Sequence, residues 1–322
     1  MTRIIVVGGI NMDLHLFGVG PSVGQAPLTA ERYMTEPGGK GANVARAAAR
    51  LGAEVRLIGC VGNDEFGRIC LDALADDGVD IDAVVVSSAA PTGFVGIELV
   101  DGRHRSLLFA PGANDHLRWT DIAPALANAE VGDILITQTE VHPQAVGELM
   151  EFASDSGLSL FLDPAPPDRV TPRMMRVADV ITPDLAEGAQ LVGRTASSRV
   201  WPTLAAAELI TAGAQRVILK AGADGAVLAD ADGVIRIPTL EIVPVDETGA
   251  GDVFIAALAV RRSEGASWEQ ATSFANVASA LSVASPGLLL PERSGIDDAL
   301  GSLASHADDA DGVAAADDRP AR

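Results

Sequence analysis

The chain has 322 residues, of which 48% are hydrophobic, and carries a formal net charge of −21. This length and apolar content suffice for one large α/β domain or two small domains with a substantial core. A negative field of this size disfavours nucleic acid and anionic membrane surfaces, and aromatic residues, at 4%, are too scarce for base-stacking platforms. We therefore expect no nucleic acid and no membrane among its partners.

The two cysteines, Cys60 and Cys70, are too few for a disulfide framework or a metal cluster. No apolar run reaches the length of a membrane span, and the first residues lack the features of a signal peptide. We therefore expect a soluble protein of the cytoplasm.

Most of the chain alternates β-branched runs with helical patterns. Strands are expected at 3–7, 54–60, 133–137, 158–162, 180–183, 216–220, 227–229 and 233–237, and helices at 44–51, 65–77, 143–156, 204–212, 267–282 and 295–303. This alternation predicts an α/β fold: a doubly wound, mostly parallel sheet with helices on both faces.

A second group of extended segments interrupts this alternation. Strands are expected at 29–35, 84–87, 93–99 and 105–109. With the turn-rich region before residue 36, they predict a small separate β-sheet, which we call the lid. Residues 1–304 are thus expected to form one domain, with lid strands from about 14–36 and 92–110. The alanine- and aspartate-rich segment 305–322 is expected to be a disordered acidic tail.

The stretch Asp246–Asp252 (DETGAGD) organises the rest. It leads into an apolar run that predicts a buried helix, so a glycine-rich turn opens the helix and presents unpaired N–H groups to an anion such as phosphate. A carboxylate at Asp252 opposes anion binding unless it accepts a proton from a hydroxyl that attacks the phosphate. The alternative is that Asp252 only caps the helix.

A second glycine-rich helix start occurs at Pro37–Asn43 (PGGKGAN), where Lys40 and Asn43 are candidate ligand contacts. Its spacing is not that of a Walker motif. Asn11 and Asp13 follow the first strand, and their spacing of two places both side chains on one face of an extended segment. They could bind vicinal hydroxyls, or form an Asx turn.

These polar residues share one position in the predicted fold, the carboxyl ends of the strands, where open α/β sheets bind ligands. They are Asn11, Asp13, Glu140, Asp163, Glu187, Gly222 and Asp252. Their shared position favours one ligand site over a separate structural role for each residue.

Two motifs give the chain a family resemblance. Residues 38–45 (GGKGANVA) and 246–252 (DETGAGD) resemble the two signatures of the ribokinase-like (PfkB) carbohydrate kinases. The segments 111–114 (PGAN) and 163–166 (DPAP) support the resemblance, which extends over nearly all of residues 3–300, and resemble the ribokinase branch more than the fructose-phosphate branch.

The resemblance implies a role for each matching residue. Asn11, Asp13, Gly39, Lys40, Asn43 and Glu140 would bind the sugar. Asp252 would be the catalytic base, with Gly249, Ala250 and Gly251 donating N–H groups to the transferring phosphoryl. Asp184, Lys220, Gly222 and Asn276 would lie near the nucleotide. Glu187 would organise Mg²⁺ through water, and Asp246 with the carbonyl of Thr248 would match part of a monovalent-cation loop.

Two positions and one segment depart from the family pattern. Asp184 replaces the asparagine of the family's N-x-x-E motif, Lys220 stands where threonine or serine is frequent, and segment 284–291 is more apolar than usual. A lysine at 220 could touch phosphate directly.

The expected function is an ATP- and Mg²⁺-dependent kinase acting on a primary hydroxyl of a small sugar, with ribose favoured and K⁺ as a possible activator. A nucleoside, a ketose or 2-keto-3-deoxygluconate are alternative acceptors, and a non-catalytic sugar or nucleotide sensor is a further alternative. The first strand lacks the G-x-G-x-x-G of a Rossmann oxidoreductase. Exposed lid edges predict a homodimer.

Overall fold

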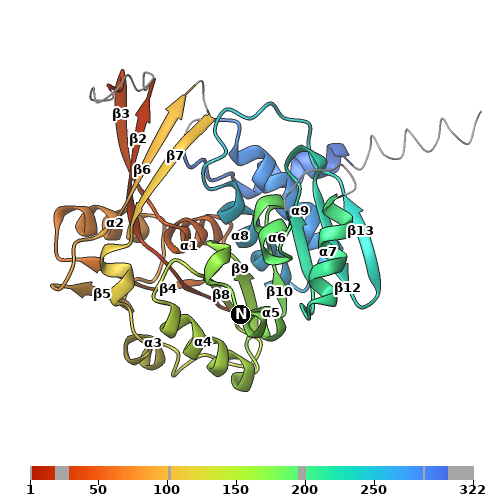
Figure 1. The fold of residues 1–322 in the computed structure, drawn as a ribbon, viewed down its shortest axis with the longest axis horizontal. Coiled ribbons are helices and arrows are strands. Elements are labelled where there is room, and N and C mark those ends of the chain that lie inside the picture. Colours follow the sequence, from red (N-terminus) through yellow and green to blue (C-terminus); the bar gives the residue numbers. More distant parts are fainter. Residues whose placement is uncertain (1, 19–28, 101–102, 195–200, 286, 304–322) are drawn as a thin grey trace, which may run out of the picture.

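The computed structural model describes residues 2–18, 29–100, 103–194, 201–285 and 287–303. They form an α/β body with a large sheet and a smaller sheet standing beside it (Figure 1). The segment 305–322, predicted to be an acidic tail, lies outside the described residues, as do lid positions 19–28.

The large sheet has the strand order β13-β12-β11-β10-β9-β8-β1-β4-β5. Its strands are β1 (Ile4–Val7), β4 (Val55–Gly62), β5 (Val84–Ser87), β8 (Ile134–Gln138), β9 (Ser159–Asp163), β10 (Val180–Ile181), β11 (Val217–Lys220), β12 (Ala226–Asp230) and β13 (Gly233–Ile237). Neighbours from β5 to β11 are parallel, and β12 and β13 add an antiparallel edge. The predicted mostly parallel sheet is confirmed.

The chain winds outward from the middle of this sheet in two directions. From β1 it proceeds through β4 to β5, and from β8, on the other side of β1, through β9 and β10 to β11. The order therefore reverses between β1 and β8, which is where open α/β sheets form a ligand crevice.

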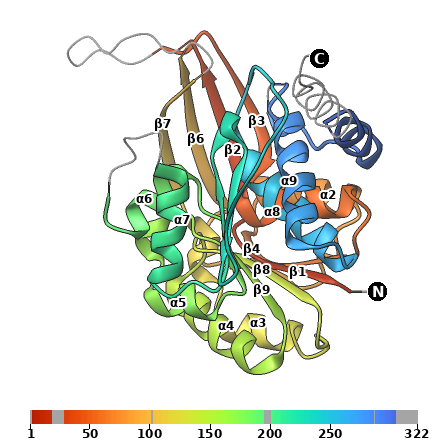
Figure 2. The same cartoon turned by 90° about the vertical axis from the view of Figure 1, so that its right-hand side faces the viewer.

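Helices cover both faces of the large sheet (Figure 2). They are α1 (Lys40–Arg50), α2 (Glu65–Asp76), α3 (Trp119–Ala125), α4 (Pro143–Ser156), α5 (Pro172–Val177), α6 (Leu185–Leu191), α7 (Trp201–Thr211), α8 (Ala250–Ser263) and α9 (Trp268–Ser282), with a further helical stretch at 293–303. Alternate side chains of β1 divide the core: Ile4 and Val6 pack with α1, α2, α8 and α9, whereas Ile5 and Val7 pack with α3 to α7.

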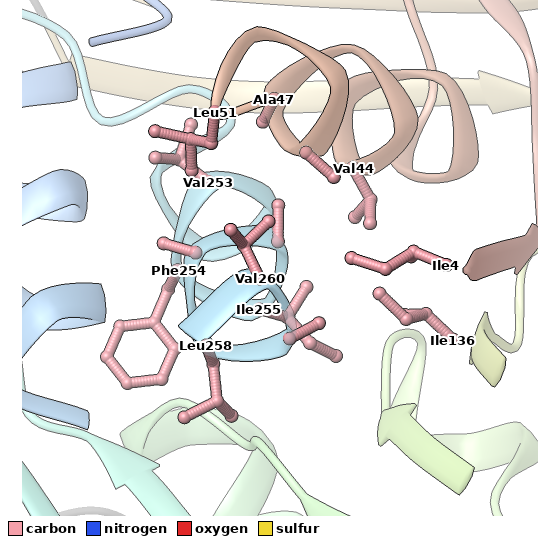
Figure 3. Close-up of a cluster of buried hydrophobic side chains, with 14 of the residues drawn as sticks. Ile4, Val44, Ala47, Leu51, Ile136, Val253, Phe254, Ile255, Leu258 and Val260 are labelled. Atoms are coloured by element: carbon pink, nitrogen blue, oxygen red, sulfur yellow. The ribbon is translucent and has the colours of Figure 1, made fainter. Parts of the chain in front are cut away.

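Helix α8 is buried along most of its length. Every residue from Asp252 to Val260 is buried, and its side chains meet β1, β8 and α1 at Ile4, Ile136 and Val44 (Figure 3). Because apolar neighbours fix this helix on several sides, its first turn is held rigidly against the strand ends.

The lid consists of β2 (Asn11–Phe17), β3 (Arg32–Gly38), β6 (Gly93–Val100) and β7 (Arg103–Ala110), in the order β3-β2-β6-β7. Only residues 8–10 separate β2 from β1, so the lid grows directly out of the central strand. The expectation that Val84–Ser87 belongs to the lid group is wrong: as β5 it pairs parallel with β4 in the large sheet.

Among the described residues, no helix combines the length and the apolar content needed to cross a membrane.

We predict that Phe254→Ala lowers the free energy of unfolding by about 3–5 kcal/mol, because Phe254 is 2% exposed and its removal leaves a cavity behind α8. The control is Phe66→Ala on α2, where the ring is 40% exposed. Urea denaturation of both variants tests this. Equal losses would show that α8 is not the better-packed helix.

Candidate active site

The first turn of α8 places Asp252 at the carboxyl ends of the large-sheet strands. Gly249, at the N-cap, has φ 74°, a left-handed conformation that glycine adopts without strain. Asp252 is 3% exposed; its Oδ2 accepts a hydrogen bond from Asn43 Nδ2 at 2.8 Å, and its Oδ1 lies 3.6 Å from Lys40 Nζ. Oδ1 has no hydrogen-bond partner among the described residues. Asp252 therefore does not cap α8 with its side chain, and one of its oxygens remains available.

The start of α1 is pressed against the loop after β1. A Cβ on Gly39 would lie 2.7 Å from the Asn11 nitrogen and the Gly9 oxygen, and Gly39 has φ 91°. Only glycine fits both the space and the backbone conformation. The Lys40 amide donates to Glu140 Oε2 at 3.1 Å, so this close approach brings the α1 start to the end of β8.

Asn11 and Asp13 lie on β2 rather than in an Asx turn, and both are buried. Asn114 Nδ2 donates to Asn11 Oδ1 at 2.8 Å, which orients the Asn11 amide. A Cβ on Gly38 would lie 2.0 Å from Asp13 Oδ2, so the glycine makes room for that carboxylate. Asn11 Nδ2 and Asp13 Oδ1 have no partner among the described residues.

A histidine continues the same face of β2. His15 is fully buried, and its Nε2 lies 2.8 Å from Oε1 of Glu36 on β3. Glu36 in turn lies beside Gly287, where a Cβ would be 3.0 Å from Oε2. Through Glu36, the partner of His15, the lid therefore lies against the loop after α9, and the sequence analysis did not single out this pair.

Asp163, at the end of β9, is completely buried and binds both lysines of the chain. Its Oδ2 lies 3.3 Å from Lys40 Nζ and its Oδ1 3.0 Å from Lys220 Nζ. The sequence analysis placed Asp163 at a strand end without a role and assigned the two lysines to different substrates. We call Asp252, Asn43, Lys40, Asp163 and Lys220 the Asp252 cluster.

The predicted nucleotide side is less closely joined to this cluster. Asp184 and Glu187 form a reciprocal cap at the start of α6: Asp184 Oδ1 accepts from the Glu187 amide, and Glu187 Oε2 accepts from the Asp184 amide, both at 2.7 Å. Gly222 opens the turn after β11 with φ 59°. Asn276 Nδ2 donates to the carbonyls of Ile237 and Pro238. Within the described ranges, none of these residues hydrogen-bonds to the Asp252 cluster.

The turn before α8 is closed by Asp246. Its Oδ1 accepts from the amide and hydroxyl of Thr248, and its Oδ2 accepts from the Gly287 amide at 3.0 Å. The apolar departure in segment 284–291 therefore does not prevent this loop from reaching the turn. In the part of the chain that the structure describes, no group of three or more His, Cys, Asp or Glu side chains is arranged to hold a metal ion by itself.

Burial dominates the acid–base properties of the site. It raises the pKa of Asp13, of Glu140 and of Glu187 to about 7 in each case, although His15, Lys40 and Lys220 respectively act against it. Burial also raises the pKa of Asp252, opposed by Lys40. Burial therefore makes these carboxyl groups weaker acids than they are in water, and a nearby cation acts in the opposite direction.

Comparison with known proteins agrees with this geometry. The sequence pattern of the pfkB family carbohydrate kinases matches residues 1–294. The chain belongs to the pfkB family of carbohydrate kinases. This kinase is 34% identical to the ribokinase of Bacillus subtilis (strain 168) over 303 residues, which cover 93% of this chain and all of that protein.

Solved structures extend the likeness to three dimensions. The ribokinase of Thermotoga maritima aligns with a TM-score of 0.82 at 29% identity, covering 94% of this kinase and 100% of that chain. The Arabidopsis thaliana ribokinase complexed with ribose and ATP aligns with a TM-score of 0.82 at 27% identity, covering 93% and 99% of the two chains. The doubly wound sheet with a small lid, expected from the strand pattern and the family resemblance, is thereby confirmed.

We predict that the stability difference between Asp13→Asn and the wild type depends on pH. The folded pKa of Asp13, about 7, lies above its ordinary value of 3.8. The folded protein therefore holds the extra proton between these values, and the wild-type free energy of unfolding falls as pH rises from about 4 to about 7. The variant escapes this loss, so it gains up to roughly 4 kcal/mol over the wild type near pH 8 and little near pH 4.

Urea denaturation at several pH values measures this difference, with the exposed Asp155→Asn in α4 as the control. A difference for Asp13→Asn that does not change with pH would mean that the carboxylate is ionised in the folded protein.

Proposed function

We propose that this kinase transfers the γ-phosphoryl group of ATP to the primary hydroxyl of a small sugar, and that the sugar is ribose, yielding ribose 5-phosphate. The observation that carries the proposal is the buried Asp252 at the start of α8, whose Oδ1 has no hydrogen-bond partner among the described residues. The likeness to ribokinases over nearly the whole chain supports the choice of sugar.

In the proposed reaction, Asp252 accepts the proton of the attacking hydroxyl. Asn43 Nδ2 donates to the second oxygen, Oδ2, at 2.8 Å, which fixes the orientation of the carboxylate and leaves Oδ1 for the hydroxyl. The glycine-rich start of α8, formed by Gly249, Ala250 and Gly251, offers first-turn N–H groups to the charge on the transferring phosphoryl. Phosphoryl transfer depends mainly on such positioning and charge neutralisation.

The acceptor is proposed to lie between the lid and α1. The polar groups that face this space are Asn11, Asp13, Gly39, Lys40, Asn43 and Glu140. Ionised carboxylates at Asp13 and Glu140 accept hydrogen bonds from sugar hydroxyls, and the unpartnered Asn11 Nδ2 can donate one. This set of donors and acceptors suits vicinal hydroxyls of an unsubstituted furanose.

The nucleotide is proposed to lie beyond Asp252, near Asp184, Lys220, Gly222 and Asn276. Glu187 is the residue that fits Mg²⁺ and its waters, because one of its oxygens caps α6 and the other is free to accept from a metal-bound water. Mg²⁺ would neutralise charge on the phosphates. Asp246 and the Thr248 carbonyl, in the turn closed by Gly287, are the proposed half-site for K⁺.

Three further features belong to the proposal. Residues 1–304 form the kinase domain, with residues 305–322 as an acidic tail, and the protein acts in the cytoplasm. It forms a homodimer through the lid, where apolar side chains are exposed: Tyr33 on β3, and Leu107, Leu108 and Phe109 on β7.

Other acceptors and a sensor role remain the competing readings. A nucleoside, a ketose or a keto-acid sugar would use the same Asp252, so the site geometry does not separate them. A non-catalytic sensor needs no buried carboxylate at the anion-binding helix start. Without this charge, the folded protein would avoid the desolvation cost of burying it.

We predict that Asp252→Asn lowers kcat by about 10²-fold or more, because the amide cannot accept the hydroxyl proton. The KM for each substrate should change far less, since the variant keeps the shape and the contact with Asn43. Steady-state kinetics with ribose and ATP measure both parameters. A near-normal kcat would remove Asp252 from the role of base.

We predict that ribose gives the highest kcat/KM in a panel of ribose, 2-deoxyribose, other pentoses, hexoses, keto-acids and nucleosides, assayed by coupled ADP formation. Addition of K⁺ should raise the rate with the preferred acceptor if the Asp246 turn binds this ion. A higher kcat/KM with a nucleoside than with ribose would replace the proposed acceptor, and ATP binding without turnover of any acceptor would favour the sensor.

A further inference from the structure

The only two lysines of the sequence, Lys40 and Lys220, come from opposite halves of the fold and meet at one carboxylate. Lys40 begins α1 on the lid side, and Lys220 ends β11 on the far side of β1. Each binds a different oxygen of Asp163, at 3.3 Å and 3.0 Å. One completely buried aspartate therefore satisfies two ammonium groups at once.

Each lysine also lies close to a different residue in the first turn of α8. Lys40 Nζ lies 3.6 Å from Asp252 Oδ1. Lys220 Nζ lies beside Gly251, only 3.0 Å from the place that a Cβ on this glycine would occupy. Both cations thus lie at the first turn of α8, one near the carboxylate of Asp252 and the other beside Gly251.

We propose that Asp163 is a positioning residue that fixes Lys40 and Lys220 on either side of the phosphoryl-transfer centre, so that the phosphoryl group arrives between two placed cations. This rests on the proposed function. Asp163 touches neither substrate in this role, because both of its oxygens are occupied by the lysines.

Electrostatics explain why such a residue is needed. Two ammonium groups this close repel each other, and a carboxylate between them removes that repulsion. Burial acts to raise the pKa of Asp163, but Lys220 and Lys40 together hold it below its ordinary value, so the carboxylate stays ionised. Without it, Lys220 is drawn toward Glu187 and Lys40 toward Glu140 and Asp252, all of which act on these lysines.

The positions of Lys40 and Lys220 matter because the groups around them are mainly negative. The chain carries a net charge of −21, and the carboxylates of Asp13, Glu140, Glu187 and Asp252 line the same region. A phosphate that enters without the two cations in place faces mainly negative groups. Arginine side chains elsewhere do not fill this role, since in the described residues only Lys40 and Lys220 form ion pairs with Asp163 or Asp252.

The first test uses the fact that the sequence has only two lysines. Mass spectrometry after brief acetylation with acetic anhydride near neutral pH reports the reactivity of each amine separately, and the reactive form is the neutral amine. Asp163 acts to raise the pKa of both lysines. In Asp163→Asn, acetylation of Lys40 and of Lys220 should therefore accelerate about tenfold or more, which corresponds to a fall of one pKa unit or more.

The matched control is Asp133→Asn. Asp133 is also a buried aspartate, and it binds the Arg3 amide and guanidinium at the amino end of β8, opposite the strand ends that carry Asp163. The Asp133→Asn variant tests whether the loss of any buried ion pair accelerates acetylation of the lysines. Asp163→Ser, a smaller neutral substitution, is used where the asparagine variant does not fold by circular dichroism.

The outcome is decisive in either direction. Acceleration at both lysines in the Asp163 variant, and at neither in Asp133→Asn, supports the proposal. Unchanged rates overturn it, and so does acceleration at a single lysine, since the proposal requires one carboxylate to hold both.

The second test follows catalysis. Burial raises the pKa of Asp252, Lys40 opposes this, and Asp163 adds to the rise. Asp163→Asn should therefore move the acidic limb of the kcat–pH profile to lower pH, while kcat falls by about 10²-fold from misplaced cations. Asp133→Asn should keep the wild-type profile. A profile for Asp163→Asn that matches this control would overturn the proposal. If the wild type phosphorylates no acceptor, the proposed function fails, yet the acetylation comparison still decides the placement of the lysines.

Discussion

The structure depends on how the buried carboxylate of Asp252 is stabilised. This carboxylate lies at a helix start that also attracts anions. Asp252 lies at the start of α8, where the first-turn amides attract anions, and it is 3% exposed. A carboxylate in this position is costly unless cations and hydrogen-bond donors surround it. Asn43 and Lys40 from α1 meet this requirement, which ties the two glycine-rich helix starts to each other at the carboxyl ends of the strands.

Much of this arrangement follows from local sequence. Alternating β-branched runs and helical patterns predict the parallel sheet, and the glycine motifs before α1 and α8 predict which helix ends approach a ligand. Pro143–Ser156 is a helix at the predicted limits because proline at its start and Gly157 after it mark both ends. The short helices α3, α5 and α6 were not predicted, since each has too few residues to establish a helical period.

Long-range contacts could not be read from the sequence. Val84–Ser87 resembles its lid neighbours in composition, but only the pairing with β4 assigns it to the large sheet. Asp163 was visible as a polar strand end, yet its partners are 123 and 57 residues away along the chain. His15 and Glu36 offered no signal, because a histidine and a glutamate on adjacent strands ordinarily face solvent. In the structure His15 is buried, and Glu36, which is only half-buried, lies beside Gly287 of the loop after α9.

The separation of the two sheets has a consequence for how such enzymes diversify. The side chains proposed to bind the acceptor come chiefly from β2 and α1, whereas those proposed for the nucleotide come mainly from the turns after β10 and β11. Substitutions along one face of the small sheet can therefore change which alcohol is accepted and leave the phosphate-handling machinery intact. The same modularity makes β2 and β3 the natural place to redirect the enzyme toward a new sugar by directed evolution.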